Sequence, residues 1–364
     1  MNDAIIIGGG LAGLTTAHLL NEKGLKVLVL ETNNCLGGRI KTVKSESGFS
    51  LEMGATWIFN DPFLKQLIQK LNIELYPQYL EGKGFYEMNF MENTQVFDVI
   101  QMTGGQVYHK VSGGTSKIIK ALENSINPEN IKMNNQATAI LDKGSYIEVS
   151  TKNRQVYKAK NVVATIPPKL LASSINFIPK LSKESQRIRL KTHTWMADSI
   201  KFSIEYKEPF WRKKGLAGYA MSNIGMVREI QDHVNESENL FGLVGFLHLT
   251  PLQYRWDKNE RKTQVIKDLT RLLGTEASKC ISYEDKIWPL ESSISETPSV
   301  NDGLYAHQYN GNNEIVKSQM NNKLFFAGAE TSIVNPGYME GAVKSAFRVT
   351  EEITNKLNIP QYEL

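Results

Sequence analysis

Three glycines near the start of the chain, Gly8, Gly10 and Gly13, have the spacing with which a backbone turn holds a pyrophosphate. Gly8 permits the tight turn, Gly10 leaves room for the pyrophosphate, and Gly13 lets the next helix pack closely on the strand. Glu31 follows about 20 residues later, where this motif places a carboxylate for the ribose hydroxyls. A carboxylate there also argues against a 2′-phosphate on the ribose. The spacing therefore predicts a dinucleotide site rather than a plain glycine turn.

The elements around the glycines are those that such a site needs. The apolar run 4–7 predicts a strand buried on both faces, and the residues after Gly13 predict a helix that ends near Gly24. A second buried strand is expected at 27–30, with Glu31 at its end. This order of strand, glycine turn, helix and strand favours an α/β fold.

A second glycine pair extends the motif. Gly37 and Gly38 precede Arg39, and Thr42 completes the pattern G-G-R-x-x-T. The pair adds backbone donors, and the arginine adds a cation, for the pyrophosphate. Through Thr42 the pattern resembles FAD-binding proteins of the flavin amine oxidase superfamily more closely than simple NAD dehydrogenases. The resemblance implies that Gly38 and Arg39 contact FAD.

Composition limits the other classes of function. The chain has 364 residues, with 41% hydrophobic and 22% charged residues, which is ordinary for a soluble protein of two domains. The net charge of +4 is scattered, with a short cluster at 212–214, so we expect no nucleic acid partner. Cys35 and Cys280 have neither metal-ligand nor disulfide spacing, which favours a reducing compartment and no metal. The first strand starts at Ala4 and no run of about 18 apolar residues exists, so we expect a cytoplasmic protein without a membrane partner.

The chain then alternates between two domains. Strand patterns return at 161–166 and end on Pro167 and Pro168, which cannot continue a sheet. We predict an α/β fold with a discontinuous FAD-binding domain of Rossmann type, similar to glutathione reductase, and a second, mixed α+β substrate domain. The FAD-binding domain comprises 1–74, 107–168 and 300–364, and the substrate domain comprises 75–106 and 169–299. Other expected elements are helices at 62–71, 259–273 and from about 340, and strands at 199–206, 240–249 and 323–330, the last ending in a glycine and an acid.

Together the motifs resemble the flavin-containing amine oxidases, and their pattern is closest to the monoamine oxidases. The similar segments cover most of the chain and include 206–214, 326–342 and Trp288. The resemblance implies that 54–57 lies along the flavin, that Glu330 bonds a cofactor hydroxyl, and that the helix starting near Glu340 directs its positive end at the flavin pyrimidine. Ala137 either meets the adenine end of FAD or is a packing residue. The implied cofactor-binding residues are Gly8, Gly10, Gly13, Glu31, Gly38, Arg39, Gly54, Ala55, Thr56, Trp57, Ala137, Trp288, Gly328, Glu330 and Met339.

The same resemblance implies a set of catalytic residues. The rings of Tyr305 and Tyr338 would stand on either side of the substrate amine, where two π faces guide a small amine and exclude bulky groups. Lys201 would hold a water near flavin N5 and assist the reaction with O2. Gln106 is either a substrate-orienting residue or an exposed turn residue.

Two departures from the family pattern modify these expectations. Leu304 stands where the monoamine oxidases have a cysteine bonded to the flavin, so we predict non-covalent FAD. The 75–106 segment is shorter than in the family, so we expect either a more open pocket or one completed by another subunit of a homo-oligomer.

The expected function is that of an FAD-dependent amine oxidase. Hydride would pass from the amine α-carbon to flavin N5, the imine would hydrolyse, and O2 would reoxidise the flavin to give H2O2. One alternative is a related oxidase or desaturase of an amino acid, a polyamine or another small molecule; an amino acid would need an arginine such as Arg228 or Arg255. Another alternative is a flavoprotein that mainly binds a partner.

Overall fold

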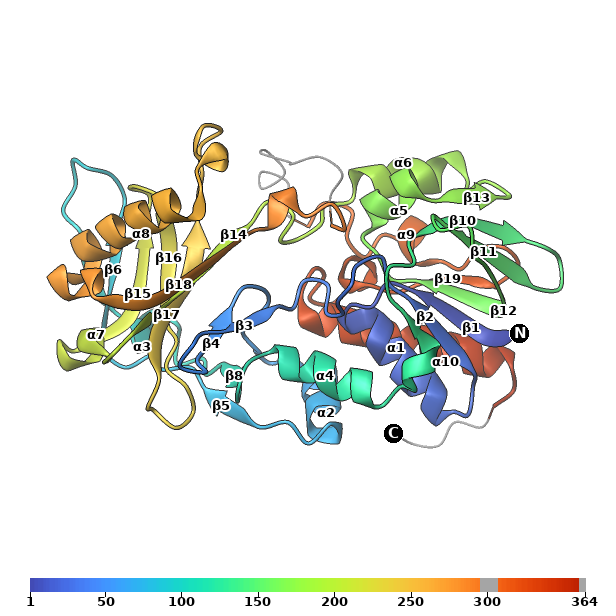
Figure 1. Ribbon diagram of the computed structural model, residues 1–364, viewed down its shortest axis with the longest axis horizontal. Coiled ribbons are helices and arrows are strands. Elements are labelled where there is room, and N and C mark those ends of the chain that lie inside the picture. The colour runs from blue at the N-terminus through green and yellow to red at the C-terminus, as the bar shows by residue number, and fades with distance from the viewer. Residues whose placement is uncertain (295–306, 360–364) are drawn as a thin grey trace.

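The structure is a computed structural model that describes residues 1–294 and 307–359. It has two lobes, each built around one sheet (Figure 1). The first sheet has eight strands in the order β13-β10-β11-β12-β1-β2-β9, with β19 paired to β12. Its strands are β1 (Asn2–Ile7), β2 (Val27–Leu30), β9 (Ile131–Lys132), β10 (Ala137–Asp142), β11 (Ile147–Thr151), β12 (Val156–Ala164), β13 (Asn176–Ile178) and β19 (Leu324–Phe326).

The centre of the first lobe is parallel, because β1 pairs in parallel with β2 and β12, and β12 with β19. Ala4 and Ile6 pack in one core with α1 and α10, whereas Ile5 and Ile7 pack on the opposite side with β10, β11 and α5. Burial on both faces explains why β1 is an uninterrupted apolar run. The helices of this lobe are α1 (Leu11–Glu22), α2 (Pro62–Lys70), α4 (Ser116–Asn124), η1 (Pro128–Asn130), α5 (Pro168–Ser174), α6 (Lys183–Lys191), α9 (Asn313–Val316), η6 (Ala329–Thr331) and α10 (Met339–Lys356).

The second lobe is a seven-stranded sheet covered on one face by α8 (Lys258–Leu273) (Figure 1). Val265 and Leu269 of α8 pack with Phe202 and Ile204 of the sheet. The order is β18-β14-β17-β16-β15-β6-β7. The strands are β6 (Lys83–Glu87), β7 (Gln95–Asp98), β14 (Ile200–Tyr206), β15 (Leu216–Ser222), β16 (Val227–Asp232), β17 (Phe241–Leu247) and β18 (Cys280–Ile287), and the short helices are α3 (Val99–Met102), α7 (Phe210–Lys213), η2 (Gln253–Arg255), η3 (Thr275–Ser278) and η4 (Trp288–Leu290).

Two small antiparallel sheets lie between the lobes (Figure 1). One pairs β3 (Thr42–Lys44) with β4 (Ser50–Glu52), and the other pairs β5 (Leu75–Pro77) with β8 (His109–Val111). They hold the segments 53–61 and 78–82 next to the second lobe.

The expected α/β fold class is confirmed. The two strands 83–87 and 95–98, which lie in the predicted 75–106 excursion, join the second sheet. Residues 169–191, predicted from the sequence to belong to the second domain, pack with the first lobe, because β13 pairs with β10 and α6 packs on α9. We therefore propose that the boundary between the lobes falls between α6 and β14.

Within residues 1–294 and 307–359, every helix is too short or too polar to cross a bilayer.

Candidate functional site

A cavity of about 890 Å³ connects the glycine turn of the first lobe with the open face of the second sheet. It is large enough to hold a cofactor together with a small substrate. It brings together most of the residues expected to bind FAD or substrate: Gly8, Gly10, Glu31, Gly38, Arg39, Gly54, Ala55, Thr56, Trp57, Ala137, Lys201, Gly328, Tyr338 and Met339.

The glycine turn has the geometry that a pyrophosphate needs. Gly8 has φ +111°, a conformation that favours glycine. A Cβ on Gly13 would lie 2.0 Å from the carbonyl oxygen of Gly8, so only glycine allows α1 to start this close to β1. A Cβ on Gly10 would meet no atom closer than 3.8 Å, which leaves its backbone accessible from the cavity. These glycines therefore fit the predicted cofactor.

Glu31 lies at the end of β2, beside the glycine turn. One carboxylate oxygen accepts a hydrogen bond from the Gly9 backbone N at 2.6 Å, and the other accepts from Asn33 N at 2.8 Å. Burial raises the pKa of Glu31, and these backbone donors oppose that rise. The carboxylate is thus held in place at the cavity wall, where ribose hydroxyls would bind.

Arg39 and Glu330 differ from their expected independent roles. Arg39 lines the cavity, but its guanidinium is paired with both oxygens of Glu330 and also donates to the Trp195 carbonyl at 2.9 Å. Glu330 is 1% exposed and does not line the cavity. The Glu330 carboxylate orients Arg39, because a buried charge needs a partner, and its bond to a cofactor hydroxyl stays a prediction.

Helix α10 begins at the cavity. Met339 and Ala342 line the wall, and no side chain caps the helix N-terminus. Glu340 points elsewhere: its carboxylate accepts from the backbone N of Phe63 at 3.2 Å and of Leu64 at 2.8 Å, at the start of α2. Glu340 thereby caps the neighbouring helix and leaves the positive end of α10 facing the cavity. This agrees with the predicted helix start near residue 340.

Lys201 is buried in the wall of the cavity, at 1% exposure. Its ammonium donates hydrogen bonds to the Gly54 carbonyl and the Thr56 hydroxyl, and lies 4.8 Å from the centre of the Trp57 ring. Burial lowers the pKa of Lys201 to about 8, although the negative charges of Glu52 and Glu229 oppose the decrease. The lysine can therefore change its charge near neutral pH, where an unperturbed lysine cannot.

Three side chains stand in a row across the second sheet. Lys201 on β14 pairs in register with Phe246 on β17, and Phe246 pairs with Glu229 on β16. All three line the cavity. Glu229 accepts a hydrogen bond from Gln231 at 2.7 Å, and burial raises its pKa. The row places one cation and one anion on either side of an aromatic ring, facing the cofactor cavity.

Tyr338 lies at the mouth of the cavity, where 43% of its surface is exposed. Its ring stacks on His307 with centroids 5.4 Å apart and lies 6.0 Å from the Trp195 ring. The expected partner, Tyr305, lies outside the described residues, as does Leu304. Phe59, another lining residue, is 36% exposed, so in the described part of the chain this end of the cavity opens to solvent.

Gln106 and Trp288 do not line the cavity, and neither do Gly13 and Glu330. Gln106 is exposed in the turn after α3, so the structure favours the exposed-turn alternative over a substrate-orienting role. Trp288 is 2% exposed and donates from its indole N to the Met53 carbonyl at 2.7 Å. Trp288 thus anchors the segment before Gly54, and its contact with the cofactor stays a prediction.

The lining residues that were not anticipated include Trp195, Glu229, Gln231 and Phe246. Glu229 and Gln231 are two positions apart, so one face of β16 carries both. That alternation is a local signal that 227–232 is a strand. Which face meets the cavity depends on pairing with β17, which no local pattern reveals.

Comparison with known proteins agrees with this geometry. The family model described as "Flavin containing amine oxidoreductase" matches residues 11–110 and 94–354. The chain is 25% identical to a probable flavin-containing monoamine oxidase A of Dictyostelium discoideum, over 98% of each protein. It is 24% identical to amine oxidase [flavin-containing] B of Cavia porcellus, over 100% of this chain and 88% of that protein.

Solved structures share the fold. Cyclohexylamine oxidase from Brevibacterium oxydans superposes with a TM-score of 0.81 at 18% identity, over 98% of this chain and 99% of that one. Wild-type putrescine oxidase bound to putrescine superposes with a TM-score of 0.80 at 18% identity, over 97% and 99%. With the family model matching most of its length, the chain belongs to the flavin-containing amine oxidoreductases, and its cofactor is FAD.

Proposed function

We propose that this oxidoreductase oxidises a primary amine with O2 and water to an aldehyde, ammonia and H2O2. The observation that carries the proposal is the position of Lys201, a buried ammonium in the wall of the same cavity that holds the glycine turn. When bound, FAD supplies the two-electron chemistry, taking a hydride equivalent from the amine α-carbon and passing both electrons to O2.

The residues that would hold FAD are distributed along the cavity. The glycine turn and Arg39 would bind the pyrophosphate, Glu31 the ribose, and the N-terminus of α10 the electron-rich edge of the flavin. Lys201 would supply a positive charge where oxygen is reduced, since negative charge develops there. A ring such as Tyr338 would orient the neutral amine and exclude bulky groups.

Within amines, the cavity favours a substrate with a second cationic group. Glu229 faces the cavity from β16, and its carboxylate could pair with a distal ammonium. One of the structurally similar enzymes is a putrescine oxidase with putrescine bound, which agrees with this choice. An amino acid substrate is less well supported, because neither Arg228 nor Arg255 lines the described part of the cavity.

The test is anaerobic stopped-flow reduction of the flavin by a panel of monoamines, diamines and polyamines, followed by a peroxide assay in air. We expect at least one diamine or polyamine to bleach the flavin and to produce stoichiometric peroxide. If no amine reduces the flavin, the proposed function is wrong.

Substitution of the lysine tests its role separately. Lys201→Met should slow reoxidation by O2 much more than reduction by amine, because the charge acts on oxygen. Lys286→Met is a matched control, since Lys286 pairs in register with Lys201 but bonds Glu291 outside the cavity. Equal slowing of both half-reactions by Lys201→Met would contradict the role.

A further inference from the structure

The indole of Trp57 is fixed by a hydrogen bond from outside its own segment. Its ring N donates to the side-chain oxygen of Gln78 at 3.1 Å. Gln78 directly follows β5 and is 5% exposed. A half-buried tryptophan needs such an acceptor, because an unpaired indole N–H costs free energy when it loses water.

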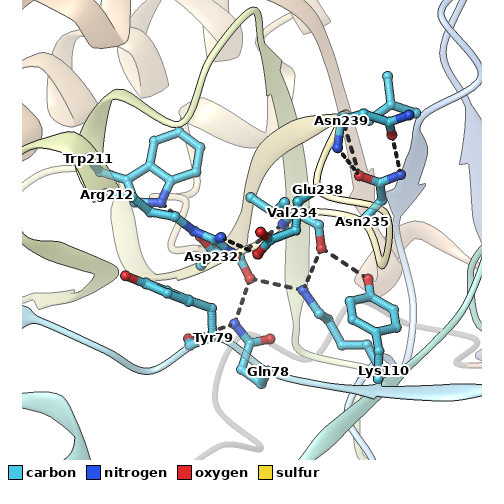
Figure 2. Close-up of polar contacts among 12 residues, drawn as sticks. Gln78, Tyr79, Lys110, Trp211, Arg212, Asp232, Val234, Asn235, Glu238 and Asn239 are labelled. Atoms are coloured by element: carbon cyan, nitrogen blue, oxygen red, sulfur yellow. Dashed lines mark hydrogen bonds and ion pairs between the residues drawn. The ribbon is translucent and has the colours of Figure 1, made fainter.

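The amide of Gln78 is held just as firmly at its nitrogen end. That nitrogen donates to the Asp232 carbonyl at 2.7 Å and to the Tyr79 carbonyl at 3.2 Å (Figure 2). The backbone N of Gln78 also donates to the Tyr108 carbonyl at 2.8 Å. With carbonyls on one side and an indole N–H on the other, the amide has one orientation that satisfies all partners. Gln78 therefore ties Trp57 to the end of β16.

The 206–214 segment anchors Asp232, whose backbone carbonyl accepts the hydrogen bond from the Gln78 amide. Its carboxylate accepts from the Trp211 indole N at 2.9 Å and from two nitrogens of Arg212, at 2.7 and 2.9 Å (Figure 2). The Arg212 guanidinium also stacks 3.7 Å from the centre of the Tyr79 ring. This part of the monoamine-oxidase-like segment lies away from the cavity, and its structural effect is to hold Asp232 in place.

Trp57, whose indole bonds Gln78, also contacts Lys201. The Lys201 ammonium lies 4.8 Å from the Trp57 ring centre and 5.7 Å from that of Phe246. A cation over an aromatic ring gains from the ring quadrupole, and the gain falls if the ring turns away. Holding the indole in place thus holds part of the environment of Lys201.

We propose that Gln78 is a positioning residue, which keeps the Trp57 indole against the Lys201 ammonium and couples the Trp211–Arg212–Asp232 anchor to the cofactor cavity. The inference rests on the proposed function for the role of Lys201 with oxygen. Glu52 and Glu229 also act on Lys201 electrostatically, and the Lys201 charge helps to lower the pKa of the buried His233. Glu52 bonds Thr115, Glu229 bonds Gln231 and His233 bonds the Ser50 carbonyl, so we expect a change at Gln78 to leave these three residues in place.

The test compares Gln78→Met with Tyr76→Phe in the FAD-loaded protein. Methionine keeps the volume of glutamine and removes the side-chain hydrogen bonds. Tyr76→Phe is the matched control, because the Tyr76 hydroxyl joins the same two regions, donating to the Val234 carbonyl at 3.1 Å, without touching Trp57. The flavin is reduced photochemically, so that its reoxidation by O2 can be followed without any amine substrate.

We expect Gln78→Met to lower the pH midpoint of the reoxidation rate by about half to one unit, and the rate at pH 8 by about threefold. Tyr76→Phe should leave both unchanged. Trp57→Phe, which keeps a ring but loses the N–H, should produce a similar shift, and the double variant should be no worse than either single one. Additive effects in the double variant, or equal effects of Gln78→Met and Tyr76→Phe, would overturn the proposal.

A second measurement does not depend on activity. The chain has five tryptophans, and Trp57→Phe assigns one indole N–H resonance to Trp57. In Gln78→Met that resonance should shift and exchange faster with solvent, while the other four stay in place. An unchanged Trp57 resonance would refute the hydrogen bond. A flavin that no amine reduces would refute only the proposed function, so the two failures are distinguishable.

Discussion

Arg39 and Glu330 form a two-pronged ion pair at the wall of the cofactor cavity: Nη1 lies 2.6 Å from Oε1, and Nη2 lies 3.0 Å from Oε2. The two residues are 291 positions apart, yet one guanidinium joins the segment after β2 to η6. The pair orients Arg39 before FAD binds, which reduces the entropic cost of FAD binding.

Arg39→Lys tests the geometry of this pair. Lysine keeps the charge but cannot donate to both oxygens of Glu330 and to the Trp195 carbonyl together. We expect the free energy of unfolding of the FAD-free protein to fall by about 1–3 kcal/mol in urea titrations, and FAD to bind about tenfold more weakly. Arg187→Lys is the control, because that arginine makes a two-pronged pair with Glu184 on the exposed side of α6. Equal, small effects of both substitutions would argue against a special role.

The charge of Lys201 predicts how reoxidation depends on pH. Its pKa is lowered to about 8, so the ammonium form dominates below pH 8 and the neutral amine above it. If the ammonium assists oxygen, the rate constant for reoxidation should fall as the pH rises through about 8, and Lys201→Met should be slow and flat from pH 6 to 10. The measurement is stopped-flow mixing of reduced enzyme with O2.

Lys110 provides the control for that profile. It is also buried, and its pKa is likewise lowered to about 8, but it bonds the Asp232 and Val234 carbonyls away from the cavity. Lys110→Met should keep the midpoint near pH 8. A midpoint that disappears with Lys110→Met and persists with Lys201→Met would assign the titration to Lys110 and contradict the role of Lys201.

Glu229→Gln tests recognition of a second cation. The amide keeps the size and the hydrogen bond to Gln231 while removing the negative charge. We expect KM for diamines to rise about tenfold or more and KM for monoamines to change less than about threefold, since a charge-assisted contact exceeds a neutral one by roughly this amount. A parallel rise for both classes would indicate a general change in the cavity.

Non-covalent attachment of FAD has a direct test. Leu304 has no thiol with which to form a thioether. Acid precipitation should therefore leave a colourless pellet and a yellow supernatant whose absorption matches free FAD. A yellow pellet after washing would show a covalent bond and contradict the prediction.

Short-range patterns predicted the elements that surround the cofactor. The helix expected at 259–273 is α8. Asp257 and Glu260 form a capping box at its start, and Gly274, at φ +101°, ends it. The glycine turn and Glu31 also lie as expected, since each depends on residues close in sequence. Such features can be recognised in the sequence, because neighbouring residues determine their geometry.

The remaining features depend on contacts between distant segments. The row of Lys201, Phe246 and Glu229 requires the register of β14, β17 and β16, which the pattern of any single strand leaves open. Likewise, Trp288 matched the family motif, but its partner proved to be the Met53 carbonyl, 235 positions away. The sequence predicted which residues belong to the candidate site more readily than it predicted which partner each residue contacts.

The cavity wall is assembled from residues as far apart as Ile7 and Ala342. A nascent chain on the ribosome has its glycine turn early, but the start of α10 is made more than 300 residues later. Until that helix is translated, nothing closes the flavin end of the site. We therefore expect stable FAD binding only after almost the whole sequence has been synthesised.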